Sequence, residues 1–243
     1  MSCPEDRLNA LRLSVNGRSS PAAAEPGGPA WAPAPTDWSP DGRWIALTTW
    51  RGSLIGRSST PAANRQVWIY APAERSLTRF AESNANTWGA RFSPDGRLIA
   101  YISDRTGEPE IYVAPFPVPG RPVRVSLAGG RDPRWRSDGR ELFYLEPVNR
   151  GRGTDLSGAS SMAFMSVSIE ETSPVRIAPP RRLFSERIWL PAGDWPWVLA
   201  MRDASTRYDV TPDGKRFLIH DPAGRRAPVL TIVEHWQRML DGR

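Results

Sequence analysis

The chain has 243 residues, of which 40% are hydrophobic and 24% are charged, and its formal net charge is +6. This composition is ordinary for a globular protein and excludes global disorder, while 20 glycines and 25 prolines indicate many turns. The single cysteine, Cys3, excludes an intrachain disulfide and a thiolate metal cluster.

The N-terminus and the charge pattern give expectations about compartment and partners. The first residues lack the apolar run of a secretory signal, and no stretch reaches the roughly 18 apolar residues that span a bilayer. As written, the chain is therefore expected to be cytoplasmic, without membrane insertion. Its arginines are interspersed with acids and form no block of like charges, so nucleic-acid binding is not expected.

Residues 1–35 differ in composition from the remainder. Between positions 21 and 35, 13 of 15 residues are Pro, Ala or Gly, a composition typical of a semi-extended linker. We therefore expect a poorly ordered segment over 1–35 and one domain over 36–243. Within the segment, Leu11–Val15 is a candidate closing strand for that domain.

An internal repeat begins after residue 35. Each copy has an aromatic or β-branched residue, an Asp-Gly turn and an apolar run, which together predict strand, tight turn and strand. The copies are Trp38–Leu47, Phe92–Tyr101, Trp135–Tyr144 and Val210–Ile219. The turn glycines of the second and third copies are 139 − 96 = 43 residues apart, which matches the period of four-stranded propeller blades.

Further strands complete each repeat. They are predicted at Gln66–Tyr70, Leu77–Phe80, Leu98–Ser103, Glu110–Pro115, Val123–Ser126, Ala163–Ile169, Arg181–Phe184 and Val229–Val233, with insertions at 50–64, 146–159 and 188–206 and a short helix at Glu234–Leu240. The sequence thus predicts an all-β fold, a β-propeller of four-stranded antiparallel blades with about four blades present. Trp38, Phe92, Trp135 and Tyr144 are expected to pack between blades, and open sheet edges are expected to favour self-association.

These residues resemble the TolB-like, WD-repeat-like β-propeller family. The resemblance covers about residues 36 to 240 and rests on the S-P-D-G-R-x-I-A units, the strand Glu110–Val113, the run Ala128–Trp135 and the ending Thr231–Trp236. The order of these pieces is most similar to the C-terminal propeller of bacterial serine/threonine protein kinases. The resemblance implies six or seven blades, so the chain is part of a larger propeller, assembles with another chain, or folds as a smaller array.

Catalytic motifs are missing from the sequence. It has no kinase H-R-D or D-F-G and no G-x-S-x-G elbow, and Gly151–Leu156 departs from a phosphate-binding loop. The two histidines, His220 and His235, are expected to be partly exposed structural residues, and they are too few for a persuasive metal site. The turn aspartates have a sufficient structural role; they are Asp41, Asp95, Asp138 and Asp213. We expect no enzyme activity, no cofactor and no metal.

Polar residues in the loops before each first blade strand are the candidate ligand contacts. These loops are expected at 84–89, 129–134 and 205–208, at one face of the propeller. The candidates are Asn86, Trp88, Arg131, Asp132, Arg134 and Arg207, together with Trp195 and Trp197 at the tip of an insertion. Such a mixture suits a protein or peptide partner, or a small anionic ligand.

The hypothesis is a non-catalytic binding or sensing module, related to the sensor region of a bacterial kinase. One alternative is a TolB-like component of an envelope complex, and a longer kinase or TolB-like protein would place the domain in the periplasm or outside the cytoplasm. The other alternative is the accessory propeller of a peptidase-type enzyme. Labelling of Ser160 or Ser161 by a fluorophosphonate would support that enzyme.

Overall fold

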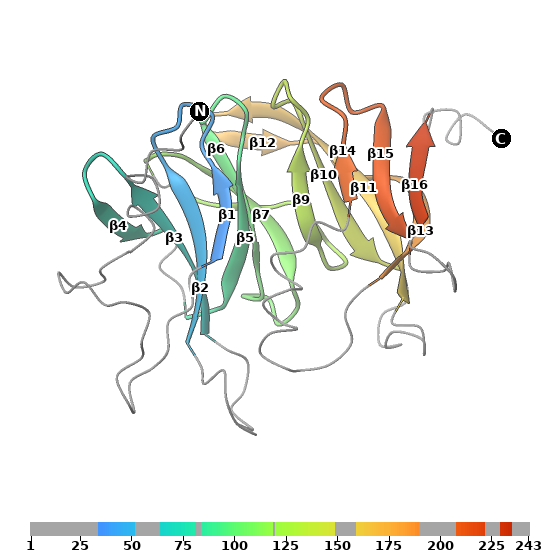
Figure 1. The fold of residues 1–243 in the computed structure, drawn as a ribbon, viewed down its shortest axis with the longest axis horizontal. Coiled ribbons are helices and arrows are strands. Elements are labelled where there is room, and N and C mark those ends of the chain that lie inside the picture. The colour runs from blue at the N-terminus through green and yellow to red at the C-terminus, as the bar shows by residue number, and fades with distance from the viewer. Residues whose placement is uncertain are drawn as a thin grey trace, which may run out of the picture.

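The regular elements of the protein form a series of antiparallel sheets. The computed structural model describes residues 34–51, 64–80, 84–118, 120–148, 159–189, 208–221 and 229–234. Within them every regular element is a strand, and the strands form four sheets in chain order. Figure 1 shows the sheets side by side, from β1–β4 at one end to β14–β16 at the other. We call the sheets blades 1 to 4.

Each blade begins with its innermost strand and adds the next strands in order. Blade 1 holds β1 (Ala34–Trp38), β2 (Ile45–Arg51), β3 (Asn64–Ala71) and β4 (Ser76–Arg79), and blade 2 holds β5 (Thr87–Phe92), β6 (Leu98–Ser103), β7 (Glu110–Pro115) and β8 (Val123–Arg124). Blade 3 holds β9 (Arg131–Trp135), β10 (Glu141–Pro147), β11 (Ala159–Thr172) and β13 (Arg181–Trp189), with β12 (Val175–Ile177) beside β11; blade 4 holds β14 (Tyr208–Val210), β15 (Arg216–Asp221) and β16 (Val229–Glu234).

The Asp-Gly turn has the same geometry in successive blades. In blade 1 the N–H of Gly42 donates to Ser39 O at 2.9 Å, and Gly42 takes a φ of 73°, which glycine adopts at little steric cost. Asp41 Oδ1 accepts from the hydroxyl of Ser39 at 2.6 Å and from the N–H of Arg43 at 3.0 Å. The predicted structural role of this aspartate is confirmed.

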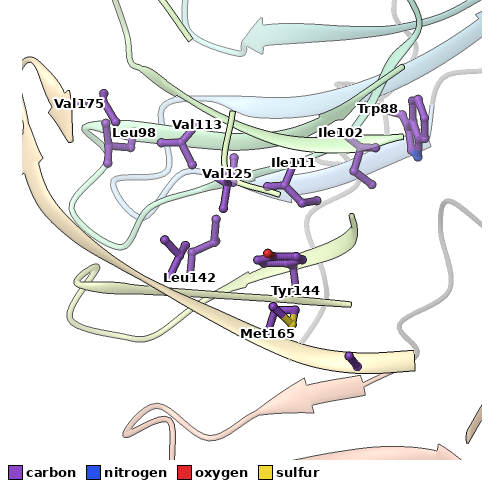
Figure 2. Packing of buried hydrophobic residues seen from close by; sticks show 13 residues of the cluster. Trp88, Leu98, Ile102, Ile111, Val113, Val125, Leu142, Tyr144, Met165 and Val175 are labelled. Atoms are coloured by element: carbon purple, nitrogen blue, oxygen red, sulfur yellow. The ribbon is translucent and has the colours of Figure 1, made fainter. Parts of the chain in front are cut away.

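Apolar side chains fill the space between neighbouring blades, because alternate residues of each strand point to opposite faces of its sheet. One cluster joins blades 1 and 2 through Ala46 and Tyr101. Figure 2 shows the next cluster, in which Leu142 and Tyr144 of blade 3 face strands of blade 2. A third cluster joins Phe143 to Phe217 of blade 4. Face-to-face packing of successive sheets is the propeller arrangement.

The structure confirms the all-β fold and the blade assignment. The strands predicted at Leu98–Ser103 and Glu110–Pro115 are found with the same bounds, as β6 and β7. Three strands have bounds that differ from the predicted ones: β1 begins at Ala34, β11 extends over Ala159–Thr172, and β16 includes Glu234. Glu234 therefore does not begin a helix, and residues 235–240 lie outside the described part of the chain.

Two further expectations were wrong. The edges of the predicted insertions belong to strands, because β2, β10 and β13 run on to Arg51, Pro147 and Trp189. Trp38 is 57% exposed, whereas its repeat equivalents Phe92 and Trp135 pack into the clusters between blades. The reason is positional: no sheet of the described residues precedes blade 1 on the side to which Trp38 points.

Candidate functional site

A charged residue occupies the same repeat position in all four blades, one residue before the aromatic or β-branched position. The four residues are Asp37, Arg91, Arg134 and Asp209. They lie on the innermost strands β1, β5, β9 and β14. We call them the inner charged column. Since β5 packs beside both β1 and β9, the column crosses the junctions between blades.

Asp37 and Arg91 link blade 1 to blade 2. The guanidinium of Arg91 donates to the carbonyl of Thr36, and its Nη1 lies 3.8 Å from Asp37 Oδ1. Asp37 Oδ2 accepts from the N–H of Phe92 at 2.8 Å. Desolvation by burial raises the pKa of Asp37 above its usual value. The pair is a partly buried ionic contact that fixes two inner strands together.

Arg134 belongs to the junction between blades 3 and 4. Its guanidinium lies 5.8 Å from the ring centroid of Tyr208, within the range of a cation–π contact. The hydroxyl of Tyr208 donates to the carbonyl of Asp132 at 2.9 Å, and Asp132 has a φ of 51°. Tyr208 is buried, and desolvation raises its pKa.

The charge of one arginine of the column acts on the other. The pKa of Arg91 is lowered, first by burial and next by the positive charge of Arg134. The indole of Trp135 donates to the carbonyl of Arg91 at 3.1 Å, which holds the two inner strands in register. Arg91 and Arg134 therefore lie on adjoining inner strands, and the charges of Asp37 and Asp132 also act on Arg91.

The expected loop location was wrong for four of the five candidate ligand contacts that the structure describes. Trp88 lies in β5, and Arg131, Asp132 and Arg134 lie in β9. The inner strands begin earlier than the sequence suggested, since β5 starts at Thr87. Only Asn86 precedes its strand. Trp195, Trp197 and Arg207 lie outside the described residues.

Asn86 and Trp88 lie together at the junction of blades 1 and 2. Asn86 Oδ1 accepts from the N–H of Arg65 at 2.8 Å, and its Nδ2 donates to Asp104 Oδ2 at 2.6 Å. The guanidinium of Arg65 lies 3.8 Å from the ring centroid of Trp88, and both Asn86 and Trp88 are buried. These contacts give both residues a structural role, and their contact with a ligand stays a prediction.

Asp37, Arg91 and Tyr208 were missed by the sequence reasoning. A signal was present for the first two, because the repeat places Asp37, Arg91 and Arg134 at one equivalent position five residues before the turn glycine. Tyr208 carries no such signal. Its role depends on the distance between its hydroxyl and a backbone carbonyl 76 residues away.

The serines considered for catalysis lie within a strand. Ser160 and Ser161 belong to β11, where they pair with Ile188 and Arg187 of β13. The side chain of His220 and all of His235 lie outside the described residues. Among the residues that the structure describes, no group of three or more His, Cys, Asp or Glu side chains is placed to hold a metal ion. The same part of the chain contains no helix with the length and apolarity of a membrane crossing.

Comparison with known proteins supports the propeller fold. No family model matches the chain. Among solved structures, TolB from Acinetobacter baumannii has a TM-score of 0.52 at 20% identity, over 87% of this chain and 42% of TolB. An acylaminoacyl peptidase has a TM-score of 0.50 at 12% identity, over 84% of this chain and 31% of the peptidase. The propeller domain of the Trilobed protease from Pyrococcus furiosus has a TM-score of 0.46 at 12% identity, over 83% of this chain and 53% of that one.

The likenesses to TolB and to the acylaminoacyl peptidase show the fold. The protein is an array of β-propeller blades, similar in structure to TolB and to an acylaminoacyl peptidase. The chain spans less than half of TolB and about a third of the peptidase.

Proposed function

We propose that the chain is a non-catalytic binding module, in which the two arginines of the inner charged column, Arg91 and Arg134, contact an acidic peptide or a small anionic ligand. The observation that carries the proposal is the position of Arg91 and Arg134 on neighbouring inner strands. The pKa of Arg91 is lowered, first by its burial and next by the positive charge of Arg134. An anion between the two guanidiniums would offset this repulsion, and arginine forks suit carboxylates geometrically.

The binding test uses a tetraglutamate peptide, with tetraglutamine as the uncharged control probe, in calorimetric titrations of the whole chain. Arg134→Gln is expected to weaken tetraglutamate binding about tenfold or more. Arg134 is the better target because Arg91 also holds the carbonyl of Thr36. The matched control is Arg140→Gln, an exposed arginine in the turn of the same blade. Equal binding of both peptides, or equal binding by both variants, would overturn the proposed ligand class.

The absence of catalysis is tested separately. A serine nucleophile needs a base within hydrogen-bond reach, and the strand positions of Ser160 and Ser161 pair them with Ile188 and Arg187. We expect a fluorophosphonate probe to leave both serines unlabelled, as read by peptide mass spectrometry with a known serine hydrolase as positive control. Stoichiometric labelling of either serine would favour the peptidase-type alternative.

The origin of the module is a finer hypothesis. The sequence resemblance favours a sensor region of a bacterial serine/threonine kinase, and the structural likeness to TolB keeps a component of an envelope complex as the alternative. The two differ in compartment and in chain length. An immunoblot of fractionated source cells, with an antibody against residues 36–243, distinguishes a kinase-sized membrane protein from a periplasmic one.

A further inference from the structure

Blade 4 exposes a face whose equivalent in each of the three preceding blades is covered by the following blade. We call the side of a blade that points toward the next blade its front face. Four residues after the turn glycine, each blade places a side chain on this face. In blades 1 to 3 the residue is Ala46, Ala100 or Phe143, each 0% exposed and packed against the next blade. In blade 4 it is Leu218, which is 42% exposed.

The cross-strand neighbour repeats this difference. Ala46, Ala100 and Phe143 pair with residues of the third strand that are also buried; these are Ile69, Val113 and Ser166. Leu218 pairs with Ile232 of β16, and Ile232 is 62% exposed. Two aliphatic side chains directly opposite each other thus lie open to solvent at a position that is core in the preceding blades.

Polar groups on the same face also match those of covered blades. Asp209 is equivalent to Asp37, whose carboxylate accepts the backbone N–H of Phe92 in the next blade, yet Asp209 is exposed. Arg216 and Glu234 form an ion pair at 3.7 Å. Blade 3 has a comparable pair on its covered side, in which Arg136 bonds to the buried Glu141 at 2.7 Å.

A hollow of about 420 Å³ lies on this face. It is lined by apolar and charged residues together: Asp209, Val210, Thr211, Pro212, Arg216, Phe217, Leu218 and Ile232. An aliphatic centre with charged groups at its rim has the composition of an interface. The side of blade 4 that faces blade 3 is fully packed through Phe217 and Ile219, so the open face is available for a further sheet.

We propose that the front face of blade 4 docks a further propeller blade supplied from outside these 243 residues. The docking blade presents large apolar side chains to Leu218 and Ile232, as blade 2 presents Ile99 and Tyr101 to blade 1. Its innermost strand donates a backbone N–H to Asp209, in the way that Phe92 donates to Asp37. The proposal is independent of the ligand proposed for the inner charged column.

Two observations decide where the blade comes from. Successive blades need about 43 residues, from Gly96 to Gly139, while the longest stretch outside the described part, 1–33, has 33 residues. A second copy of the chain offers one exposed aromatic side chain, Trp38, on the corresponding side of its blade 1, where a following blade supplies large apolar side chains such as Ile99 and Tyr101. The corresponding side chains of its blade 1, Ile45 and Leu47, are already buried.

The test is photo-crosslinking in the cells that produce the protein naturally. A photoreactive amino acid replaces Leu218, and in a second strain Ile232, and the crosslinked peptide is sequenced by mass spectrometry. The expected peptide contains an Asp-Gly turn followed by an apolar strand and lies outside residues 1–243. A peptide from the same face of a second copy, a peptide without blade sequence, or no crosslink in a normally accumulating protein overturns the proposal.

Matched variants distinguish specific docking on the front face of blade 4 from nonspecific crosslinking at an exposed apolar residue. Val118 is also apolar and exposed but lies after β7 in blade 2, so a photoreactive residue there is expected to capture no blade peptide. Leu218→Glu is expected to lower crosslinking at position 232 about tenfold or more, because docking would bury an unpaired charge. Val118→Glu is expected to leave it unchanged. Equal crosslinking at position 232 in the Leu218→Glu and Val118→Glu variants would contradict docking on the front face of blade 4.

Discussion

The backbone N–H of Phe92 donates to Asp37 Oδ2 at 2.8 Å, across the junction between blades 1 and 2. The same carboxylate lies beside the guanidinium of Arg91. Two favourable contacts therefore hold an acid in a place where burial opposes its charge, and burial is the larger effect, since the pKa of Asp37 is raised. The junction uses a carboxylate for orientation at some cost in stability at neutral pH.

This balance predicts a pH dependence of opposite sign for two neighbouring acids. The folded pKa of Asp37 lies above the usual 3.8, so between these two values the folded state binds more protons at Asp37 than the unfolded state does. The contribution of Asp37 to the free energy of unfolding therefore falls as pH rises from 3.8 through the folded pKa. The pKa of Asp41 is lowered by bonds from Ser39 and Arg43, so its contribution rises as pH rises toward 3.8. Urea unfolding of wild type, Asp37→Asn and Asp41→Asn across acidic pH measures both. Parallel pH profiles for the two variants would contradict the assignment.

The turn glycines predict a difference between an open turn and a turn packed against the preceding blade. Gly96 and Gly214 have φ values of 69° and 73°, so Gly→Ala costs about 1–2 kcal/mol at both for the left-handed backbone. A Cβ at Gly96 meets nothing within 4 Å, whereas one at Gly214 lies 3.1 Å from Phe143 Cζ and 3.0 Å from Arg136 Cδ. Gly214→Ala should therefore lose about 1–3 kcal/mol more, as measured by denaturant midpoints. Equal losses would mean that the junction relaxes freely.

Adjacent residues of β15 should respond differently to truncation. Phe217 is fully buried, and its ring lies 5.2 Å from that of Phe143 and 5.5 Å from that of Phe164. Phe217→Ala is expected to cost about 3–5 kcal/mol. Leu218→Ala should cost less than about 1 kcal/mol in the purified chain, because its side chain is already open to solvent. Thermal unfolding of the two variants measures the contrast, and a large loss for Leu218→Ala would show that this face is covered within the chain.

Two tyrosine hydroxyls provide a further matched pair. Tyr208 donates to the carbonyl of Asp132, so Tyr208→Phe is expected to lose about 1 kcal/mol. The hydroxyl of Tyr144 is buried and has no hydrogen-bond partner among the described residues, so Tyr144→Phe should be neutral or stabilising. Chemical denaturation compares them directly. A loss at Tyr144 equal to that at Tyr208 would indicate an additional partner for the Tyr144 hydroxyl.

The blade repeat was readable from the sequence because its signals are local. Pro94, Asp95 and Gly96 determine a turn through their own backbone preferences and through bonds spanning a few residues. The alternation of apolar residues after the turn then predicts strands such as β6. The position of Trp38 was misjudged because its burial depends on the presence of a preceding sheet, which the repeat pattern does not reveal.

The candidate site was predicted only in part. Arg134 and Asp132 were selected for their residue types, but Asp37, Arg91 and Tyr208 became visible as a group only when the inner strands were placed side by side. Asn86 shows the opposite case. It was expected to be a polar loop residue available to a ligand. In the structure its side-chain amide is buried at a junction between blades, where it accepts from the N–H of Arg65 and donates to Asp104.

By itself, the sequence determined the strand order, the turn chemistry and the blade period, since each depends on interactions within a few residues or on a repeated pattern. The tertiary structure alone decided which polar groups meet between blades and which face stays open. Those outcomes depend on contacts between residues far apart in the chain, such as Asp37 with Phe92 and Tyr208 with Asp132. The repeat then allows a prediction for Leu218, because a following blade covers the equivalent residue in each of the three preceding blades.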